Sequence, residues 1–263
     1  MFDWMKQRAG IAVAVLAAAG LFGAIRLSHA ADPSALWHII DGRCIPHEEQ
    51  AHDPSPCSKV DLSEGRQSGY VVLKDINGAS QFLLMPTARI HGIESAEILA
   101  ADAANYWDLA WQSRYFVEER LQHLLTREDV ALAINSDVGR TQDQLHIHID
   151  CVRPDVQAAL VGHLAQIGPQ WAPFPAVLAG HSYRAMRLEQ ENLGDKNPFR
   201  LLADADPKAA EDMGNHTLVV VGATFPGNVL GFVLLDDHAD LAAGDHASGE
   251  ELQDHSCALA KAG

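Results

Sequence analysis

An alternating run of apolar and polar residues, from position 144 to position 150, constrains the fold of this chain more than any other feature. Leu145, Ile147 and Ile149 occupy every second position of the run. Because successive side chains of a β-strand point to opposite faces, the run predicts a strand with one face against the core. The other face carries polar groups that packing alone does not explain: Gln144, His146, His148 and Asp150.

The segments around this strand predict an α+β fold built on an antiparallel sheet. An apolar strand at 130–134 leads through a polar turn at 135–139 into the histidine strand, so the two are expected to pair antiparallel. Further hairpins are expected at 69–86, around Asn77-Gly78, and at 217–235. Helices are expected from Ser34 as a cap, at 106–116, from Pro154, from Asn197 and at 207–213, with a Pro-rich loop at 44–58 and a strand within 178–190.

The composition limits what the chain can bind. The 263 residues carry a formal net charge of −16 and are 48% hydrophobic, enough for a substantial core. An acidic chain does not bind nucleic acid through a broad basic surface, so we expect no nucleic-acid partner. A phosphate-bearing ligand would need a local site.

The N-terminus resembles a targeting segment. Lys6 and Arg8 precede an uncharged apolar run at 9–25, and Ser28-His29-Ala30 offers a small-x-small cleavage pattern. Residues 1–30 are therefore expected to be a single-pass membrane helix or a cleaved signal peptide, and a buried helix is the weaker alternative. In either exported form, residues 31–263 make one domain outside the cytoplasm, on the periplasmic side of the inner membrane if the source is a Gram-negative bacterium.

The four cysteines fit export to an oxidising compartment. We expect the pairs Cys44–Cys57, which closes a short local loop, and Cys151–Cys257, which ties the C-terminal segment to the histidine strand. Free buried thiols are the alternative. Since no C-x-x-C occurs, a zinc knuckle or a thioredoxin-type redox site is not expected.

The histidine pair alone leaves several interpretations open. His146 and His148 can hold a metal with Asp150 or a distant histidine as a third ligand. They can also form a proton relay, or one imidazole can be a nucleophile supported by the other. With 14 histidines in the chain, ordinary surface histidines are a further possibility.

The order of elements resembles the histidine triad superfamily of nucleotide hydrolases and transferases. Gly139-Arg140-Thr141 stands where that family has its Gly-Gln-Ser/Thr lead, and Phe82 to Ile93 resembles its strand-to-Pro segment. The register places Gln144 at the first histidine of the motif, His146 at the nucleophile and His148 at the third position. The resemblance implies an α+β fold with a histidine-triad-like antiparallel sheet and helices, here preceded by an N-terminal membrane helix.

One branch, the bacterial CDP-diacylglycerol pyrophosphatases, is more similar still. Leu84-Met85-Pro86-Thr87, Leu132 to Ser136, Gly139 to Gln142, Arg153 to Val156 and Gln253 to Cys257 carry the resemblance, which runs from about Leu36 onward. It implies a membrane-bound hydrolase that cleaves CDP-diacylglycerol to CMP and phosphatidate, with no cofactor and no metal.

The resemblance and the chemistry together suggest roles for individual residues. His146 would attack phosphorus to give a nucleotidyl-histidine, and His148 would contact the phosphates or protonate the leaving group. Phosphate contacts are expected from Asn135, Thr141, Gln144 and Arg140. Lys74 and Arg89 are weaker candidates for contacts with the substrate. Asp150 is expected to have either a structural or a chemical role. Residues 171–175 are a candidate apolar wedge toward the lipid. The alternatives are another nucleoside diphosphate hydrolase or nucleotidyl transferase of the superfamily, or an exported metal-binding protein.

Overall fold

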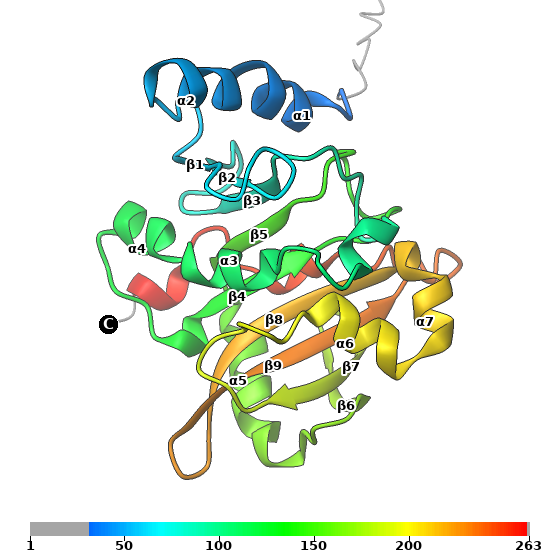
Figure 1. Ribbon diagram of the computed structural model, residues 1–263. Coiled ribbons are helices and arrows are strands. Elements are labelled where there is room, and N and C mark those ends of the chain that lie inside the picture. The colour runs from blue at the N-terminus through cyan, green and yellow to red at the C-terminus, as the bar shows by residue number, and fades with distance from the viewer. Residues whose placement is uncertain (1–31, 262–263) are drawn as a thin grey trace, which may run out of the picture. The chain divides into compact units, whose positions relative to one another are not determined.

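A computed structural model describes residues 32–261 and shows a nine-stranded antiparallel sheet with helices on both faces (Figure 1). The strand order is β1-β2-β3-β5-β4-β8-β9-β7-β6. The strands are β1 (Lys59–Asp61), β2 (Tyr70–Lys74), β3 (Phe82–Pro86), β4 (Val130–Ile134), β5 (Ile147–Cys151), β6 (Ala172–Leu178), β7 (His181–Leu188), β8 (His216–Phe225) and β9 (Val229–His238).

The helices are short, and the longest of them have no more than ten residues. They are α1 (Ala35–Ile39), α2 (Ile45–Ala51), α3 (Tyr106–Gln112), α4 (Tyr115–Leu121), α5 (Pro154–His163), α6 (Pro198–Ala205) and α7 (Pro207–Glu211). A π-turn (Ile40–Cys44) joins α1 to α2, and a 3₁₀ turn, η6 (Gly249–Leu252), follows β9. The α+β class and the antiparallel sheet expected from the sequence are confirmed.

The histidine strand lies inside the sheet, and its alternation correctly predicts which residues share a face. β5 pairs antiparallel with β3 on one side, where Leu83 faces His148, and with β4 on the other, where Ala133 faces His148. Leu145, Ile147 and Ile149 are buried in the largest apolar cluster, together with residues of α3 and α6. His146 and His148 project to the opposite face.

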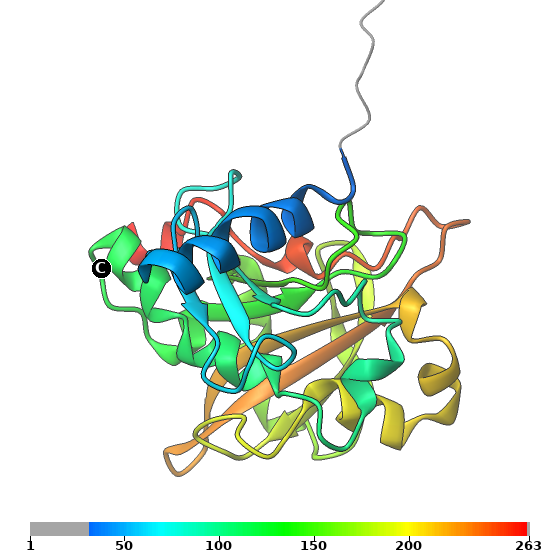
Figure 2. The same ribbon diagram turned by 45° about the horizontal axis from the view of Figure 1, so that its top comes forward.

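That opposite face carries two separate apolar clusters. One lies between α1–α2 and strands β2 and β3, which these helices cover in Figures 1 and 2. The other lies between α5 and strands β4, β6, β7, β8 and β9. Since β5 lies between the two clusters, its histidines emerge where neither helix layer covers the sheet completely.

Both expected disulfides are present: Cys44–Cys57 and Cys151–Cys257. The first joins the end of the π-turn to the loop before β1. The second joins the last residue of β5 to the C-terminal segment, so that segments 106 residues apart in sequence lie together.

Three local expectations are wrong. The expected loop at 44–58 is helical in its first half, because Pro46 lies in the first turn of α2, where proline costs no hydrogen bond. The helix expected at 106–116 is two helices with a break at Ser113 and Arg114. Ser34 makes no capping hydrogen bond from its side chain.

The expected membrane helix at 1–30 lies outside the described residues. From residue 32 to residue 261, no helix has the length and apolar character needed to cross a bilayer.

Candidate active site

His146 is held in one orientation by the backbone just before β5. The ring lies buried, and its Nδ1 is 2.6 Å from the carbonyl oxygen of Gln144. Because a carbonyl only accepts, Nδ1 carries the proton and Nε2 keeps its lone pair. Burial lowers the pKa of His146, which also favours the neutral ring. The arrangement leaves a neutral imidazole with one free nitrogen at neutral pH.

His148 packs against His146 and faces a carboxylate. The two rings are 4.8 Å apart between centroids. Nδ1 of His148 is 3.0 Å from Nε2 of Gln81 and 3.1 Å from Oε1 of Glu250, and Nε2 is buried without a partner among the described residues. Burial lowers the pKa of His148 to about 3, although the charge of Glu250 opposes the shift. His148 is therefore neutral at pH 7 and has an unsatisfied nitrogen.

Glu250 is fixed by two amides as well as by His148. Its Oε1 accepts from Nε2 of Gln81 at 3.0 Å, and its Oε2 accepts from Nδ2 of Asn135 at 2.9 Å. The oxygen of Asn135 in turn accepts from the backbone N–H of Glu250 at 3.2 Å. Burial disfavours the carboxylate, but His148 and these amide donors outweigh burial and lower the pKa of Glu250. Glu250 is thus held as a carboxylate anion next to His148.

A glycine allows the segment of Glu250 to approach the sheet. A Cβ added at Gly249 would lie 2.7 Å from both Oγ1 of Thr217 and Cγ2 of Val219, and 3.3 Å from Cβ of Ala133. Ala133 is the residue opposite His148 in the β4–β5 pair. Because positions 133 and 249 both carry small residues, η6 packs closely against β4, beside the two histidines.

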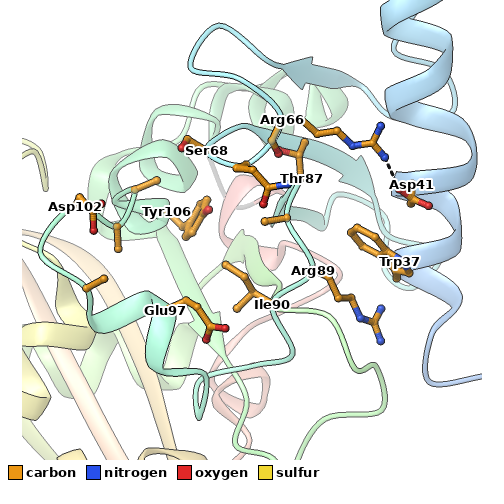
Figure 3. Close-up of a pocket in the computed structure, with 15 residues that line it drawn as sticks. Trp37, Asp41, Arg66, Ser68, Thr87, Arg89, Ile90, Glu97, Asp102 and Tyr106 are labelled. Carbon is orange, nitrogen blue, oxygen red and sulfur yellow. Dashed lines mark hydrogen bonds and ion pairs between the residues drawn. The ribbon is translucent and has the colours of Figure 1, made fainter.

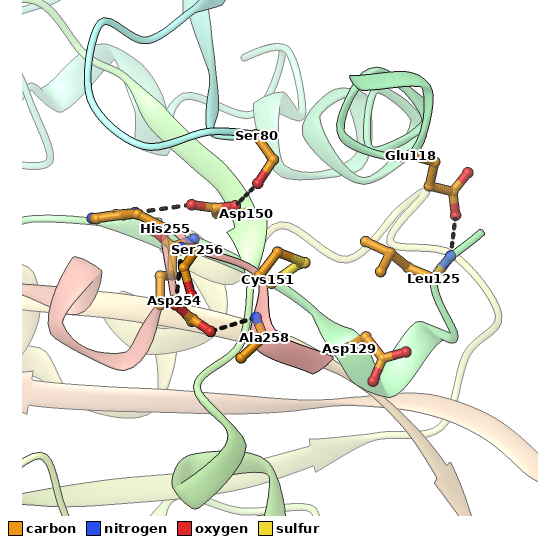
Figure 4. The surroundings of a disulfide bond; sticks show 12 residues. Ser80, Glu118, Leu125, Asp129, Asp150, Cys151, Asp254, His255, Ser256 and Ala258 are labelled. Carbon is orange, nitrogen blue, oxygen red and sulfur yellow. Dashed lines mark hydrogen bonds and ion pairs between the residues drawn. A yellow bond between two sulfur atoms is a disulfide. The ribbon is translucent and has the colours of Figure 1, made fainter. Parts of the chain in front are cut away.

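A second imidazole–carboxylate pair, His255 and Asp150, lies beside Glu250; Figure 4 shows this pair together with Ser80. Nδ1 of His255 is 2.9 Å from Oδ2 of Asp150, whose other oxygen accepts from Ser80 at 3.0 Å. This hydrogen bond raises the pKa of His255 against the effect of burial. Burial raises the pKa of Asp150, with His255 opposing the shift. Nε2 of His255 is 3.8 Å from Glu250, so the pair continues the polar chain from His148.

A cavity of about 300 Å³ lies in front of the histidines. One wall is polar and includes His146, His148, Asn135 and Glu250. The other wall is mainly apolar and comes from α1 and from the β2–β3 hairpin: Ala35, Leu36, Ile39, Leu73, Ile76 and Leu83, with Asp75 at the same hairpin. This volume is at the lower end of the range for small-molecule sites, which is about 300–1,000 Å³.

A larger cavity, of about 650 Å³, contains neither histidine (Figure 3). Trp37, Arg66 and Thr87 line it, and Arg66 forms an ion pair with Asp41. Although it is larger, it holds no group with a free nucleophilic nitrogen. We therefore place the candidate active site in the smaller cavity.

The residues expected to contact phosphate divide into two groups. Asn135 and Thr141 line the cavity with the histidines; Thr141 is exposed, while the amide of Asn135 binds Glu250 and Ser248. Gln144 and Arg140 do not line it. Nε2 of Gln144 donates to the carbonyl oxygens of Pro86 and Ala88, so only its backbone carbonyl takes part, through His146.

Arg140 is surrounded by carboxylates. Its guanidinium makes two contacts of 2.7 Å with Glu94 and also contacts Asp137 and Asp143. A side chain held by three acidic partners is not available to a phosphate in this arrangement. The structure does not support the expectation that Arg140 neutralises the substrate. The charge of Arg140 is already neutralised by acidic residues of its own turn and of the neighbouring loop.

The remaining candidates also have other partners. Lys74 lines the cavity, but its ammonium donates to backbone carbonyls of the hairpin loop, including Asp75 at 2.6 Å. Arg89 lines the larger cavity and contacts Asp143. Asp150 binds Ser80 and His255, which leaves it no role as the third ligand of a metal on His146 and His148.

The expected lipid wedge at 171–175 is wrong in position. Its residues begin β6, the edge strand at the opposite end of the sheet from α1. Phe174 is buried in a core cluster, and the indole of Trp171 donates to the carbonyl of Leu201. These aromatic residues therefore pack within the domain.

Sequence reasoning missed Glu250 as a partner of His148 and left the role of His255 unassigned. Neither shares a local pattern with the histidine strand, from which they are about a hundred residues distant. The available signal was the expected Cys151–Cys257 disulfide, since it brings the residues just before Cys257 against the end of β5.

Comparison with known proteins identifies the family of this chain. The sequence profile of the family described as CDP-diacylglycerol pyrophosphatase matches residues 31–261. The chain belongs to this family. It is also 44% identical over 254 residues to a Yersinia pestis protein named CDP-diacylglycerol pyrophosphatase, covering 97% of this chain and 94% of the relative. The resemblance to the CDP-diacylglycerol pyrophosphatases is thereby confirmed.

Proposed function

We propose that this chain hydrolyses CDP-diacylglycerol to CMP and phosphatidate through a covalent cytidylyl-histidine at His146. The observation that carries the proposal is the orientation of that ring. Its Nδ1 proton is held by the carbonyl of Gln144, and it lines a cavity with its remaining nitrogen unprotonated. A neutral nucleophile meets less repulsion from the oxygens of a diphosphate than an anionic one.

The first step forms one bond and breaks another. Nε2 of His146 bonds to the phosphorus of the CMP half, and the bond from that phosphorus to the phosphatidate oxygen breaks. The departing oxygen gains a proton or an equivalent hydrogen bond. In the second step, a water molecule gives a proton to His148 and its oxygen attacks the same phosphorus, the P–N bond breaks, and CMP leaves with His146 free again.

His148 is the proposed proton carrier for the leaving group. Its Nε2 is buried and unpartnered among the described residues, so an incoming phosphate oxygen gives it the missing partner. Burial lowers the pKa of His148 to about 3. A bound diphosphate adds negative charge next to the ring and raises that pKa, which lets His148 take up a proton and pass it to phosphatidate.

The size of the cavity supports the binding of only one half of the substrate inside it. About 300 Å³ suits a nucleoside monophosphate, whereas two acyl chains are much larger. We therefore assign the apolar wall of Leu36, Ile39 and Leu83 to the pyrimidine ring, and the polar wall to the phosphates. Asp75 is the one carboxylate of the hairpin side and suits the ribose hydroxyls. The lipid half extends out of the cavity.

We also propose that the enzyme acts at the bacterial inner membrane, anchored by residues 1–30 with its catalytic domain in the periplasm. The apolar run at 9–25 and the two disulfides support this location. Removal of residues 1–30 is expected to preserve hydrolysis of a soluble CDP compound and to reduce hydrolysis of bilayer substrate. Equal loss of both activities would contradict the separate roles of residues 1–30 as an anchor and of the rest of the chain as the catalytic domain.

The covalent step is tested by rapid quenching with CDP-diacylglycerol labelled in the cytidine. Label should appear on the protein, and His146→Ala should abolish both this label and CMP release, by at least about 10³-fold. His123→Ala, at an exposed histidine, is the matched control and should behave as the wild type. Full turnover by folded His146→Ala would reject the nucleophile. A panel with CDP-choline and dinucleoside polyphosphates separates this activity from that of other nucleotidyl hydrolases.

A further inference from the structure

A second cluster of ligand-type side chains lies away from the active-site cavity. His181 is the first residue of β7, Asp237 lies near the end of β9, and Asp245 follows in the loop after β9. One ligand atom from each lies within 4.8 Å of the others. β7 and β9 pair side by side in the sheet, as Figure 1 shows, so the sheet itself fixes two of the three groups.

The carboxylate of Asp237 points to a missing ligand. Asp237 is only 7% exposed, and its Oδ2 is buried with no hydrogen-bond partner among the described residues. Its other oxygen accepts from the backbone N–H of His238 at 2.8 Å. A buried carboxylate oxygen without a donor is costly, because burial removes water without replacing it.

The charges around Asp237 make this cost larger. Asp245 is also 7% exposed, and its Oδ1 is 3.6 Å from Nδ1 of His181. Glu251 accepts from His181 at 2.7 Å and from the hydroxyl of Tyr183 at 2.7 Å. The cluster thus has three carboxylates and a single imidazole as its basic group.

We propose that His181, Asp237 and Asp245 form a divalent metal site, with Glu251 as a fourth ligand. One imidazole and several carboxylates suit a first-row transition ion such as Zn²⁺ or Mn²⁺, whereas Ca²⁺ prefers a shell made only of oxygen. The ion would give Oδ2 of Asp237 its missing partner and neutralise the repulsion between the two aspartates.

The proposed ion would also anchor the catalytic segment. Glu251 adjoins Glu250 in η6, and the two side chains bind opposite partners: Glu251 contacts His181, while Glu250 contacts His148. Fixing Glu251 at a metal therefore limits the movement of Glu250. In this scheme the ion has a positioning role and does not touch substrate.

Metal titration of the full-length chain after chelation and dialysis tests the site. Calorimetry and elemental analysis with Zn²⁺ or Mn²⁺ should show about one ion per chain, and bound metal should raise the melting temperature. Asp237→Asn should lose that ion and the increase in melting temperature. Asp204→Asn, an exposed aspartate, is the matched control and should keep both.

The variant also separates a metal site from a structural cluster. Without metal, Asp237→Asn should be at least as stable as the wild type, since it removes a buried charge. Identical binding by wild type, Asp237→Asn and His181→Ala would overturn the proposal, as would the absence of any bound ion. Because binding and melting are measured without substrate, failure of the nucleophile assignment at His146 would not affect these outcomes.

Discussion

Nδ1 of His148 lies 3.1 Å from the carboxylate of Glu250, a residue that reaches it from a segment beyond β9. Two amides and a close glycine contact hold that carboxylate in place. The geometry makes Glu250 a positioning residue that supports a positive charge on His148, whose Nδ1 also lies 3.0 Å from Nε2 of Gln81. Several consequences can be measured.

Glu250→Gln should lower kcat more than it raises KM. The substitution removes the negative charge that stabilises a protonated His148, so proton delivery to the leaving group becomes less favourable. A loss of about 10²–10⁴-fold in kcat is expected, the range for one general acid. Glu211→Gln, at an exposed glutamate, is the control. An unchanged pH–rate profile in Glu250→Gln would argue against the coupling to His148.

Gly249→Ala should disturb the site without touching a polar group. The new methyl would meet Thr217 and Val219 at 2.7 Å and push η6 from the sheet. We expect a loss of about 1–3 kcal/mol in unfolding free energy, the usual cost of overpacking, together with a lower kcat. Gly168→Ala, where an added Cβ has no neighbour within 4 Å, should be close to neutral in both measurements. Equal effects of the two variants would show that the close approach is unimportant.

The buried histidines should make the protein less stable in acid. The folded-state pKa of His148 is about 3, below its ordinary value near 6.5. Between these values the unfolded chain binds a proton that the folded chain does not, so stability falls as pH falls, by about 1.4 kcal/mol per pH unit per group. His148→Gln should reduce this dependence of the unfolding free energy on pH, as measured by denaturant unfolding between about pH 6 and about pH 4. A parallel slope in the variant would place the acid sensitivity elsewhere.

The two disulfides should differ in their effect on catalysis. Loop-closure entropy predicts losses of about 3 kcal/mol for a short loop and about 4.7 kcal/mol for one near a hundred residues, the class of Cys151–Cys257. Replacing Cys151 and Cys257 by alanine should also lower kcat, because His255 is two positions from Cys257. Replacing Cys44 and Cys57 should act mainly on KM through α1, which lines the cavity. Denaturant unfolding and steady-state kinetics of both double variants provide the comparison.

Local patterns predicted the histidine strand well. Period-two alternation identified which face of Leu145, Ile147 and Ile149 is buried, because one buried face is enough to fix the register of a strand. The same pattern identified His146 and His148 as polar residues that packing alone does not explain. Proline in the first turn of α2 was less informative, since a proline-rich segment is compatible with a loop or with a helix start.

The partners of the site residues were harder to predict. Arg140 and Gln144 have the residue types of phosphate contacts, but the structure assigns them to Glu94 and to the Pro86 carbonyl. Such pairings depend on tertiary contacts between distant segments. Glu250 was missed for the same reason, since only the fold brings η6 beside β5.

The late position of Glu250 in the chain has a consequence for biosynthesis. A nascent chain translated only through β9 already contains His146 and His148, with the strands that carry them. It lacks the carboxylate and the imidazole that complete the arrangement around them. Growing polypeptides would therefore remain catalytically incompetent until their final segment emerges from the ribosome and docks.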